Sequence, residues 1–167
     1  GEDGSEAAGF GQPSRTSIFD YIPVPAHQRW MNGGRFDGGQ LFPREKELRE
    51  WYRRLLNLVR SEAAFLGSST SLHRLNASEN PGYPASDVYA FERQKGRERI
   101  VVVVNFRDDL QQFELRLSGD EAMHVSSSPH VLLGKGRVQA NPVTDTGTGR
   151  HLTVELEANG FLILKFE

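Results

Sequence analysis

The residues best suited to chemistry lie near the N-terminus, where two carboxylates stand among aromatic side chains. Asp20 and Asp37 share a glycine-rich stretch with Tyr21, Trp30 and Phe36. Two carboxyl groups held about 5–5.5 Å apart can break a glycosidic bond with retention of configuration, and flat aromatic rings can stack on sugar rings. The alternative, which the residue types favour, is that the aspartates cap turns of a loop and that the rings are buried against a partner surface.

The remaining motifs indicate no metal, thiol or phosphate chemistry. None of the five histidines pairs with another at helical spacing or stands beside an acidic residue at metal-ligand spacing, so we expect no zinc site and no cofactor. The absence of cysteine excludes disulfides and cysteine nucleophiles. Zinc-protease, serine-elbow and P-loop motifs are also missing. The tripeptide Asn76-Ala77-Ser78 fits the glycosylation pattern, which is frequent by chance.

Charge and hydropathy exclude two classes of partner. The 167 residues include 20 Lys and Arg against 22 Asp and Glu, a formal net charge of −2, so we expect no nucleic-acid partner. The longest apolar run, residues 100–104, is far shorter than the roughly 18 residues of a membrane helix, so we expect no membrane partner. The first ten residues lack the basic and apolar regions of a signal peptide. The length fits one domain plus a fragment of another, and the compartment stays open.

Two different elements must position these residues. Residues 1–42 keep neither a helical nor a strand period, and we expect a long ordered loop that packs on a larger body. Residues 43–61 predict an amphipathic helix that begins at Pro43. Its apolar stripe consists of Leu48, Trp51, Tyr52, Leu55, Leu56 and Val59. Because a bare stripe of this size associates, we expect it to dock on the rest of the chain or on a second copy.

From residue 70 onward the apolar residues alternate with polar ones, which is typical of strands. The expected strands are residues 87–93, 98–106, 112–117, 130–134, 151–157 and 161–167, with turns at 94–97, 107–109 and 158–160. Residues 98–106 are apolar on both faces, and Asn159-Gly160 is a hairpin signal. Short strands at this spacing with no helix among them predict a mostly β protein, an antiparallel Greek-key β-sandwich of about 100 residues.

Three motifs in the N-terminal stretch carry a family resemblance: RTSIFDY, HQRW and GRFDGG. Together with the helical segment REKELREWYRRLLNLVRSEAAFLG, they resemble the end of the catalytic barrel in a bacterial subgroup of the alpha-amylase family, glycoside hydrolase family 13. The segments DVYAFERQKGRERIVVVVNF and ANGFLILKF resemble the all-β C-terminal domain of that family, domain C. The resemblance covers essentially the whole chain. It implies a loop after the last barrel strand (1–42), the last barrel helix and a connector (43–66), and domain C (67–167).

The resemblance also implies a function. The parent enzyme would act on α-glucans such as starch and maltooligosaccharides through a retaining mechanism, and the catalytic barrel would be this chain's partner. In the family the catalytic aspartate, glutamate and second aspartate lie on earlier barrel strands, so we expect no catalytic residue here and a mainly structural, inactive fragment. By analogy with the active-site face of a barrel, Arg15, Asp20, Tyr21 and Trp30 would border the substrate cleft.

A second reading remains beside the first. The chain could be a free-standing carbohydrate-binding β-sandwich that stacks sugars on Tyr21, Trp30 or Phe36. Because these aromatics precede the helix and do not lie on strands, the first reading is favoured. An interaction module without a sugar role would leave the glycine- and aromatic-rich loop unexplained. Self-association through the face of helix 43–61 remains one of the two ways in which the apolar stripe could be covered.

Overall fold

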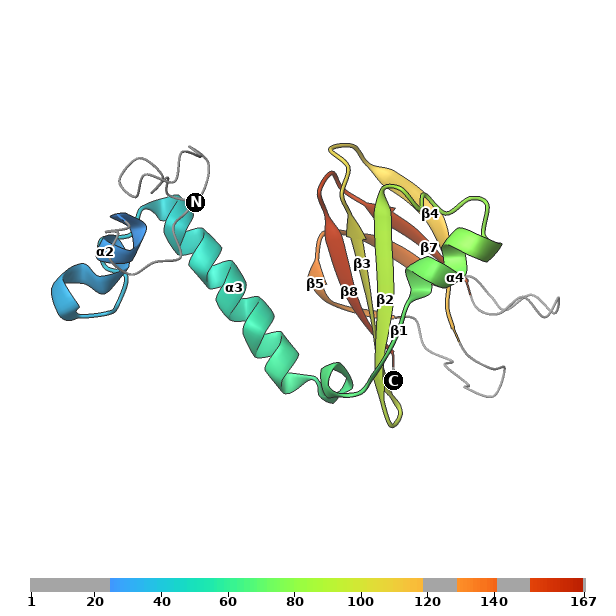
Figure 1. Cartoon of the computed structure of the whole chain (residues 1–167), viewed down its shortest axis with the longest axis horizontal. Helices are drawn as coiled ribbons and strands as arrows, with labels where there is room; N and C mark the ends of the chain where they lie inside the picture. Colours follow the sequence, from blue (N-terminus) through green and yellow to red (C-terminus); the bar gives the residue numbers. More distant parts are fainter. Residues whose placement is uncertain (1–24, 119–128, 141–150, 167) are drawn as a thin grey trace, which may run out of the picture. The chain divides into compact units, whose positions relative to one another are not determined.

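The computed structural model describes residues 25–118, 129–140 and 151–166 (Figure 1). The chain forms two compact units, Gly1–Asn57 and Leu58–Glu167. The described elements, in chain order, are α2 (Pro25–Met31), η1 (Asn32–Gly34), α3 (Pro43–Ser61), η2 (Ala63–Leu66), β1 (Ser68–Thr70), α4 (Leu72–Glu79), β2 (Val88–Lys95), β3 (Glu98–Asn105), β4 (Gln111–Arg116), β5 (His130–Gly134), β6 (Gly136–Ala140), β7 (His151–Leu156) and β8 (Phe161–Phe166).

Helix α3 confirms the helix predicted over residues 43–61. The backbone N–H of Phe42, just before the helix, donates to the Glu45 Oε2 atom at 2.8 Å. A glutamate at the third helical position that reaches back in this way satisfies an N–H group that the helix leaves without a partner. Among the described residues no side chain of α3 is buried, and Leu56 is 61 % exposed.

The expectation of loop throughout residues 1–42 is wrong for residues 25–31, which form helix α2. Pro25 opens this helix, where its fixed φ angle is already helical and its missing N–H costs nothing. The helix has seven residues, which is too short for an apolar repeat to be recognised in the sequence.

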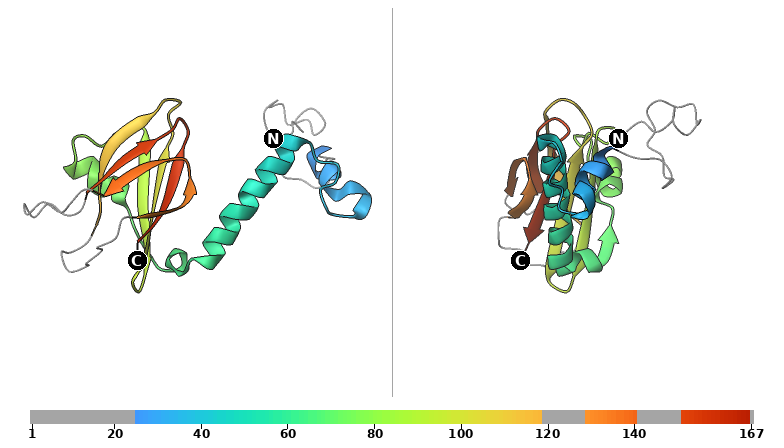
Figure 2. Two further views of the ribbon diagram at one scale, coloured as in Figure 1. Left: turned by 180° about the vertical axis from the view of Figure 1, so that it is seen from behind. Right: turned by 90° about the vertical axis from the view of Figure 1, so that its left-hand side faces the viewer.

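The second unit is the predicted antiparallel β-sandwich (Figures 1 and 2). One sheet has the strand order β1-β2-β3-β8-β5, and the other has the order β4-β7-β6. The sheets enclose one apolar core, because alternate residues of each strand point inward. The fully buried members are Leu72, Ala90, Val101, Val103, Leu115, Leu152, Val154, Leu156, Leu162 and Leu164, each with 0 % exposure.

The turn signals in the sequence predict most of the positions at which the strands end. Strand β3 is buried on both faces, as predicted, and β7 buries every second residue. Asn159, in the predicted hairpin between β7 and β8, has a φ of 49°, which asparagine tolerates better than most residues. The predicted turn at 94–97 is too long, because β2 continues to Lys95 and pairs with Glu98.

The expectation that no helix lies among the strands is wrong. Helix α4 covers Leu72–Glu79, between β1 and β2. Its sequence LHRLNASE offers two leucines three residues apart, so the helical period is barely visible. The signal that could have found it is Ser71, whose side chain accepts a hydrogen bond from the Arg74 N–H at 3.1 Å as an N-cap. Strands β1 and β6 were also missed, because they are short and largely polar.

Candidate functional site

Trp30 is the predicted cleft residue that the structure describes; Arg15, Asp20 and Tyr21 lie outside the described residues. Its indole ring meets the Phe36 ring edge-on, with 5.7 Å between centroids. The loop returns to Trp30 because the Gly38 N–H donates to the Trp30 carbonyl oxygen at 3.0 Å. Gly38 has a φ of +70°, and a Cβ there would lie 2.9 Å from the Cδ1 of Leu41, so glycine is needed at this turn. Trp30 is half-buried and fixed in place by its own loop.

Asp37 caps the same loop and confirms the turn-capping interpretation. Its Oδ1 atom accepts hydrogen bonds from the Asn32 side chain at 2.7 Å and from the Gly39 N–H at 2.8 Å. The Asn32 amide, followed by the Gly39 N–H, holds the pKa of Asp37 below its usual value. Because Asp20 lies outside the described residues, a pairing of the two carboxylates is untested.

Arg29 joins α2 to the start of α3. Its guanidinium forms a two-bond ion pair with Glu45, with the Arg29 Nε at 3.1 Å from Oε2, and it stacks 4.4 Å from the ring centre of Phe42. Arg29, followed by the Phe42 N–H, lowers the pKa of Glu45. The sequence gives no sign of this contact, because 16 residues separate the partners.

The segment that follows α3 is fastened to the five-stranded sheet. Glu98 of β3 accepts the Ala64 N–H at 2.8 Å, and Lys165 of β8 forms an ion pair with Glu62 at 2.8 Å. Lys165 also lies 3.7 Å from the Glu98 carboxylate. Two strands therefore hold η2 through charged groups that are only partly exposed.

Gly67 ends this segment in contact with β2. Arg93 of β2 donates to the carbonyl oxygens of Phe65 and Gly67, the latter at 2.9 Å. A Cβ on Gly67 would lie 1.8 Å from the Gln94 carbonyl oxygen, so no other residue fits without a backbone shift. We call residues 62–67 the connector.

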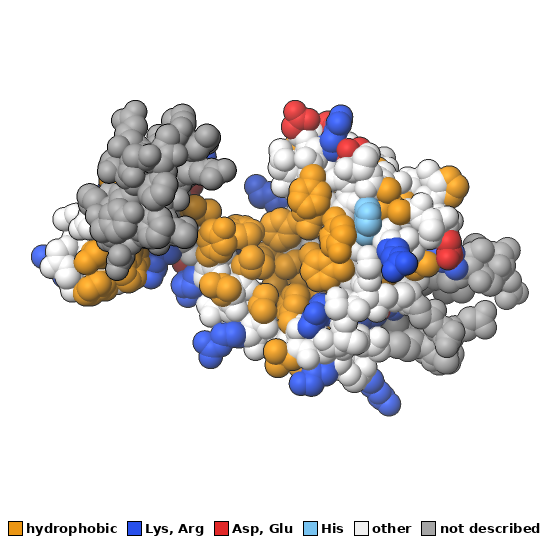
Figure 3. All heavy atoms as spheres, in the orientation of Figure 1, with side chains coloured by type: hydrophobic (Ala, Val, Ile, Leu, Met, Phe, Trp, Pro, Cys, Tyr) orange, Lys and Arg blue, Asp and Glu red, His pale blue; other side chains and the backbone are white. Residues whose placement is uncertain are grey.

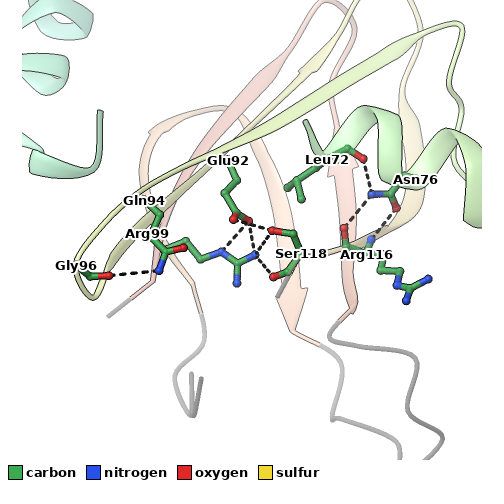
Figure 4. Close-up of polar contacts among 8 residues, drawn as sticks. All are labelled: Leu72, Asn76, Glu92, Gln94, Gly96, Arg99, Arg116 and Ser118. Atoms are coloured by element: carbon green, nitrogen blue, oxygen red, sulfur yellow. Dashed lines mark hydrogen bonds and ion pairs between the residues drawn. The ribbon is translucent and has the colours of Figure 1, made fainter. Parts of the chain in front are cut away.

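A buried ion pair lies inside the sandwich, between β2 and β3 (Figure 4). The Arg99 Nε donates to the Glu92 Oε2 at 2.8 Å, and the Ser118 hydroxyl donates to the other carboxylate oxygen at 2.7 Å. Arg99 also donates to the Ser118 carbonyl oxygen at 2.7 Å. In the sequence Glu92 stands at the next alternate position after Val88 and Ala90, but no residue pattern there indicates its partner. With both oxygens hydrogen-bonded, Glu92 acts as a structural carboxylate.

Asn76 of α4 completes the edge of β4 (Figure 4). Its amide nitrogen donates to the carbonyl oxygens of Leu72 and Arg116 at 2.8 and 2.9 Å, and its oxygen accepts the Arg116 N–H at 2.8 Å. The side chain is 0 % exposed. The glycosylation pattern at Asn76-Ala77-Ser78 is therefore a chance match, since the acceptor nitrogen is buried and bonded.

The described ranges contain no group of three or more His, Asp or Glu residues that could hold a metal ion. None of the helices in those ranges has both the length and the apolar character needed to cross a lipid bilayer. Burial raises the pKa of Tyr83, whose hydroxyl donates to the Val88 carbonyl oxygen at 2.9 Å. The buried polar side chains described above, those of Asn76, Tyr83, Glu92 and Arg99, thus bond to strands and loops of the sandwich itself.

The class of this molecule follows from its architecture. It is a β-sandwich domain of two antiparallel sheets, preceded in the chain by an amphipathic helix and by a connector that is bonded to one of the sheets. Residues 83–167 match the family model for the alpha amylase C-terminal all-beta domain. The chain belongs to this family, and the resemblance seen in the sequence is confirmed. Such a domain normally pairs with the catalytic barrel of alpha-amylase family enzymes.

Several solved structures resemble this chain at low sequence identity. The debranching enzyme of Nostoc punctiforme matches with 17 % identity and a TM-score of 0.53, over 72 % of this chain and 21 % of that enzyme. The alpha-amylase of H. orenii matches with 20 % identity, a TM-score of 0.47 and coverage of 78 % and 23 %. An isomaltulose synthase of Erwinia rhapontici, solved with D-glucose, matches with 24 % identity, a TM-score of 0.43 and coverage of 70 % and 17 %. This chain spans about a fifth of their length, and no curated protein matches it.

Proposed function

We propose that this chain is the C-terminal part of an alpha-amylase-like glycoside hydrolase that acts on α-glucans such as starch and maltooligosaccharides. The family match over residues 83–167 carries the proposal. Helix α3, directly before the connector, supports it, because an amphipathic helix with no buried side chain needs a further surface to pack on. In this proposal residues 1–42 follow the last barrel strand, residues 43–66 are the last barrel helix and the connector, and residues 67–167 are domain C.

Within the parent enzyme, Arg15, Asp20, Tyr21 and Trp30 border the substrate cleft. The contact of Trp30 with Phe36 supports this role, because a ring that is fixed before the sugar arrives loses little entropy on binding. In this proposal the substrate is bound in the barrel and only borders this chain. The barrel supplies the acid/base and the nucleophile. The chain itself has a structural role.

Glucan titration followed by tryptophan fluorescence tests whether this chain is structural and the barrel alone is catalytic. Two variants distinguish the fluorescence of the two tryptophans. Trp30→Phe leaves the signal of Trp51 in the helix, and Trp51→Phe leaves the signal of Trp30 in the loop. We expect no saturable change with starch or maltoheptaose and no reducing sugar released by the chain. The full-length protein that contains it should release reducing sugar with retained anomeric configuration.

Two results would contradict the proposal in different ways. Saturable quenching that persists in Trp51→Phe and vanishes in Trp30→Phe would support the binding-module reading instead. Sugar released by the isolated chain would show that catalytic carboxylates lie in it, and Asp20 and Asp37 would be replaced first.

We also propose that the isolated chain self-associates through the apolar stripe of α3. Leu48, Tyr52 and Leu56 are each more than half exposed, at 58 %, 53 % and 61 %. Sedimentation equilibrium should show a mass that rises with protein concentration, and Leu56→Glu should abolish the rise. Arg54→Glu, at an exposed position outside the stripe, is the matched control. A constant monomer mass for the unsubstituted chain would refute the idea.

A further inference from the structure

Two Asn-Gly pairs occur in the sequence, Asn32-Gly33 and Asn159-Gly160. Glycine has no side chain that would shield its peptide nitrogen, so this nitrogen can reach the side-chain amide of the preceding asparagine. Asparagine is accordingly among the thermolabile residues of proteins. The two asparagines also share a positive φ, 47° and 49°, so their surroundings must decide which of them reacts.

The Asn32 amide is held by its own loop. Its nitrogen donates to the Asp37 Oδ1 at 2.7 Å, and the same oxygen accepts the Gly39 N–H at 2.8 Å. A hydrogen bond to a charged acceptor is roughly twice as strong as a neutral one. The amide of Asn32 is therefore fixed beside a negative charge, which disfavours the approach of an anionic peptide nitrogen.

Asn159 lies at the exposed tip of the hairpin between β7 and β8. Its side chain has no hydrogen-bond partner among the residues that the structure describes. The backbone forms a β-turn that the Gly160 N–H closes by donating to the Glu157 carbonyl oxygen at 2.9 Å. Figure 3 shows acidic and basic side chains at this end of the sandwich, the upper end in that view, as expected of a turn that faces water.

We propose that Asn159 is a site of spontaneous deamidation, with water as the co-reactant. The Gly160 peptide nitrogen loses its proton and bonds to the Cγ of Asn159, and the side-chain nitrogen leaves with a proton as ammonia. Water then opens the resulting succinimide ring at either of its carbonyl carbons. The product is an aspartyl or an isoaspartyl residue, and no atom is oxidised or reduced. The reaction needs neither barrel nor sugar, so the site is independent of the proposed function.

The hydrogen bond of the turn opposes this reaction only weakly. The Gly160 N–H must leave the Glu157 carbonyl oxygen before its nitrogen can turn toward Cγ. A bond at an exposed hairpin tip opens far more readily than the bonds of core strands. At Asn32 the charge-assisted bond to Asp37 must break before the amide can react. We therefore expect conversion at Asn159 to be at least about tenfold faster than at Asn32.

The isoaspartyl product alters the hairpin, because the side-chain Cβ becomes part of the main chain and lengthens the turn. The turn is bonded to the end of β3. The Asn105 N–H donates to the Gly160 carbonyl oxygen at 2.8 Å, and the Asn105 side chain donates to the Glu157 carbonyl oxygen at 2.9 Å. These bonds lie on either side of the added atom, so the longer turn strains or breaks one of them.

Peptide mass spectrometry of the whole chain, sampled during incubation in mildly alkaline buffer, measures the conversion of each asparagine. Fragmentation of the main chain distinguishes isoaspartyl from aspartyl peptides. Asn159→Gln is the matched control, because its longer side chain would have to close a larger and less favourable ring. This variant should show no conversion at position 159 and an unchanged rate at Asn32.

Incubation in urea separates the effect of the fold from that of the sequence. Both pairs should convert at similar rates there, because neither the turn nor the bond to Asp37 survives. In the folded chain Asp37→Ala should raise the rate at Asn32 about tenfold and leave the rate at Asn159 unchanged. If circular dichroism shows that Asp37→Ala disturbs the helices, the comparison with urea still decides the role of the fold.

Several results would overturn the assignment. They are conversion at Asn32 before Asn159 in the folded chain, a difference in rate that persists in urea, and no conversion at Asn159 while the sample in urea converts fully. The effect on the hairpin is read separately, on the isoaspartyl fraction isolated by anion exchange. Hydrogen exchange of the Asn105 N–H should be faster in that fraction than in the unconverted chain, and equal exchange would contradict the predicted change in the turn.

Discussion

Replacing Asn76 with alanine removes the side chain that closes the open edge of a sheet. Strand β4 is at the edge of the three-stranded sheet, so one side of its backbone has no neighbouring strand. Asn76 bonds both backbone groups of Arg116 on that strand, much as a further strand would. The exposed edge is thereby kept from pairing with another chain.

The size of the effect follows from the bonds that are lost. In Asn76→Ala the N–H and C=O groups of Arg116 lose this partner, and each buried polar group left unsatisfied costs about 1–3 kcal/mol. Water reaches part of this region, so we expect the lower half of the summed range, a loss of roughly 2–4 kcal/mol in the free energy of unfolding. That is a large fraction of the 5–15 kcal/mol or so that stabilises an ordinary domain.

Urea denaturation followed by far-UV circular dichroism measures this loss as a lower midpoint at unchanged slope. Ser78→Ala is the matched control, because Ser78 is exposed on the same helix and its loss should change stability by no more than about 0.5 kcal/mol. A loss below about 1 kcal/mol for Asn76→Ala would refute the role assigned to this side chain.

Asn76→Asp separates the hydrogen bonds from the packing. The carboxylate has the same shape but cannot donate to the carbonyl oxygens of Leu72 and Arg116, and burial beside them raises its folded pKa above the unfolded value of about 3.9. The destabilisation is therefore complete above the folded pKa and shrinks as the pH falls, because the protonated acid can donate again. This account would be contradicted if the difference in free energy of unfolding between the variant and the parent chain did not change with pH.

Three further changes test other contacts. Arg99→Met should cost about 3–5 kcal/mol in urea unfolding by leaving Glu92 buried without its partner, and the added change Glu92→Leu should recover most of it. Gly67→Ala should destabilise the sandwich in the same assay, whereas Gly82→Ala, where a Cβ meets only ordinary contacts, should be nearly neutral. Because the pKa of Glu45 is lowered, its stabilising contacts are fully present above about pH 4.5 and are lost as the pH falls through the folded pKa, so an acid titration should show helix content falling more in the parent chain than in Glu45→Gln.

The strands could be predicted because period and turn chemistry agree along most of the C-terminal half. The alternation in β7 and the apolar run of β3 both matched the buried positions of the sandwich. The Asn159-Gly160 signal placed the last hairpin, since few residue pairs tolerate its backbone angles. These features are local, so each can be recognised from a few neighbouring residues.

The contacts missed from the sequence join residues far apart in the chain. Glu62 and Lys165 are separated by 103 residues, and Asn76 and Arg116 by 40. A glutamate or an asparagine in a polar segment looks like any surface residue until the fold brings its partner alongside. The candidate cleft residue Trp30 was named through family resemblance, whereas its support by Phe36 and Gly38 depends on a loop closure that carries no periodic signal.

The buried polar groups of the sandwich explain how β3 keeps its register. A run of valines packs almost equally well after a shift by one residue, yet such a shift would turn every inward side chain outward. Arg99 near the start of the strand and Asn105 at its end prevent this, because a shift would break the ion pair with Glu92 and the Asn105 bonds to the carbonyl oxygens of Asp109 and Glu157 at 2.8 and 2.9 Å. A buried ion pair adds little net stability, because removing the two charges from water offsets their attraction. We therefore infer that these groups are kept because they select one register of β3 among the shifted registers that the valines alone would allow.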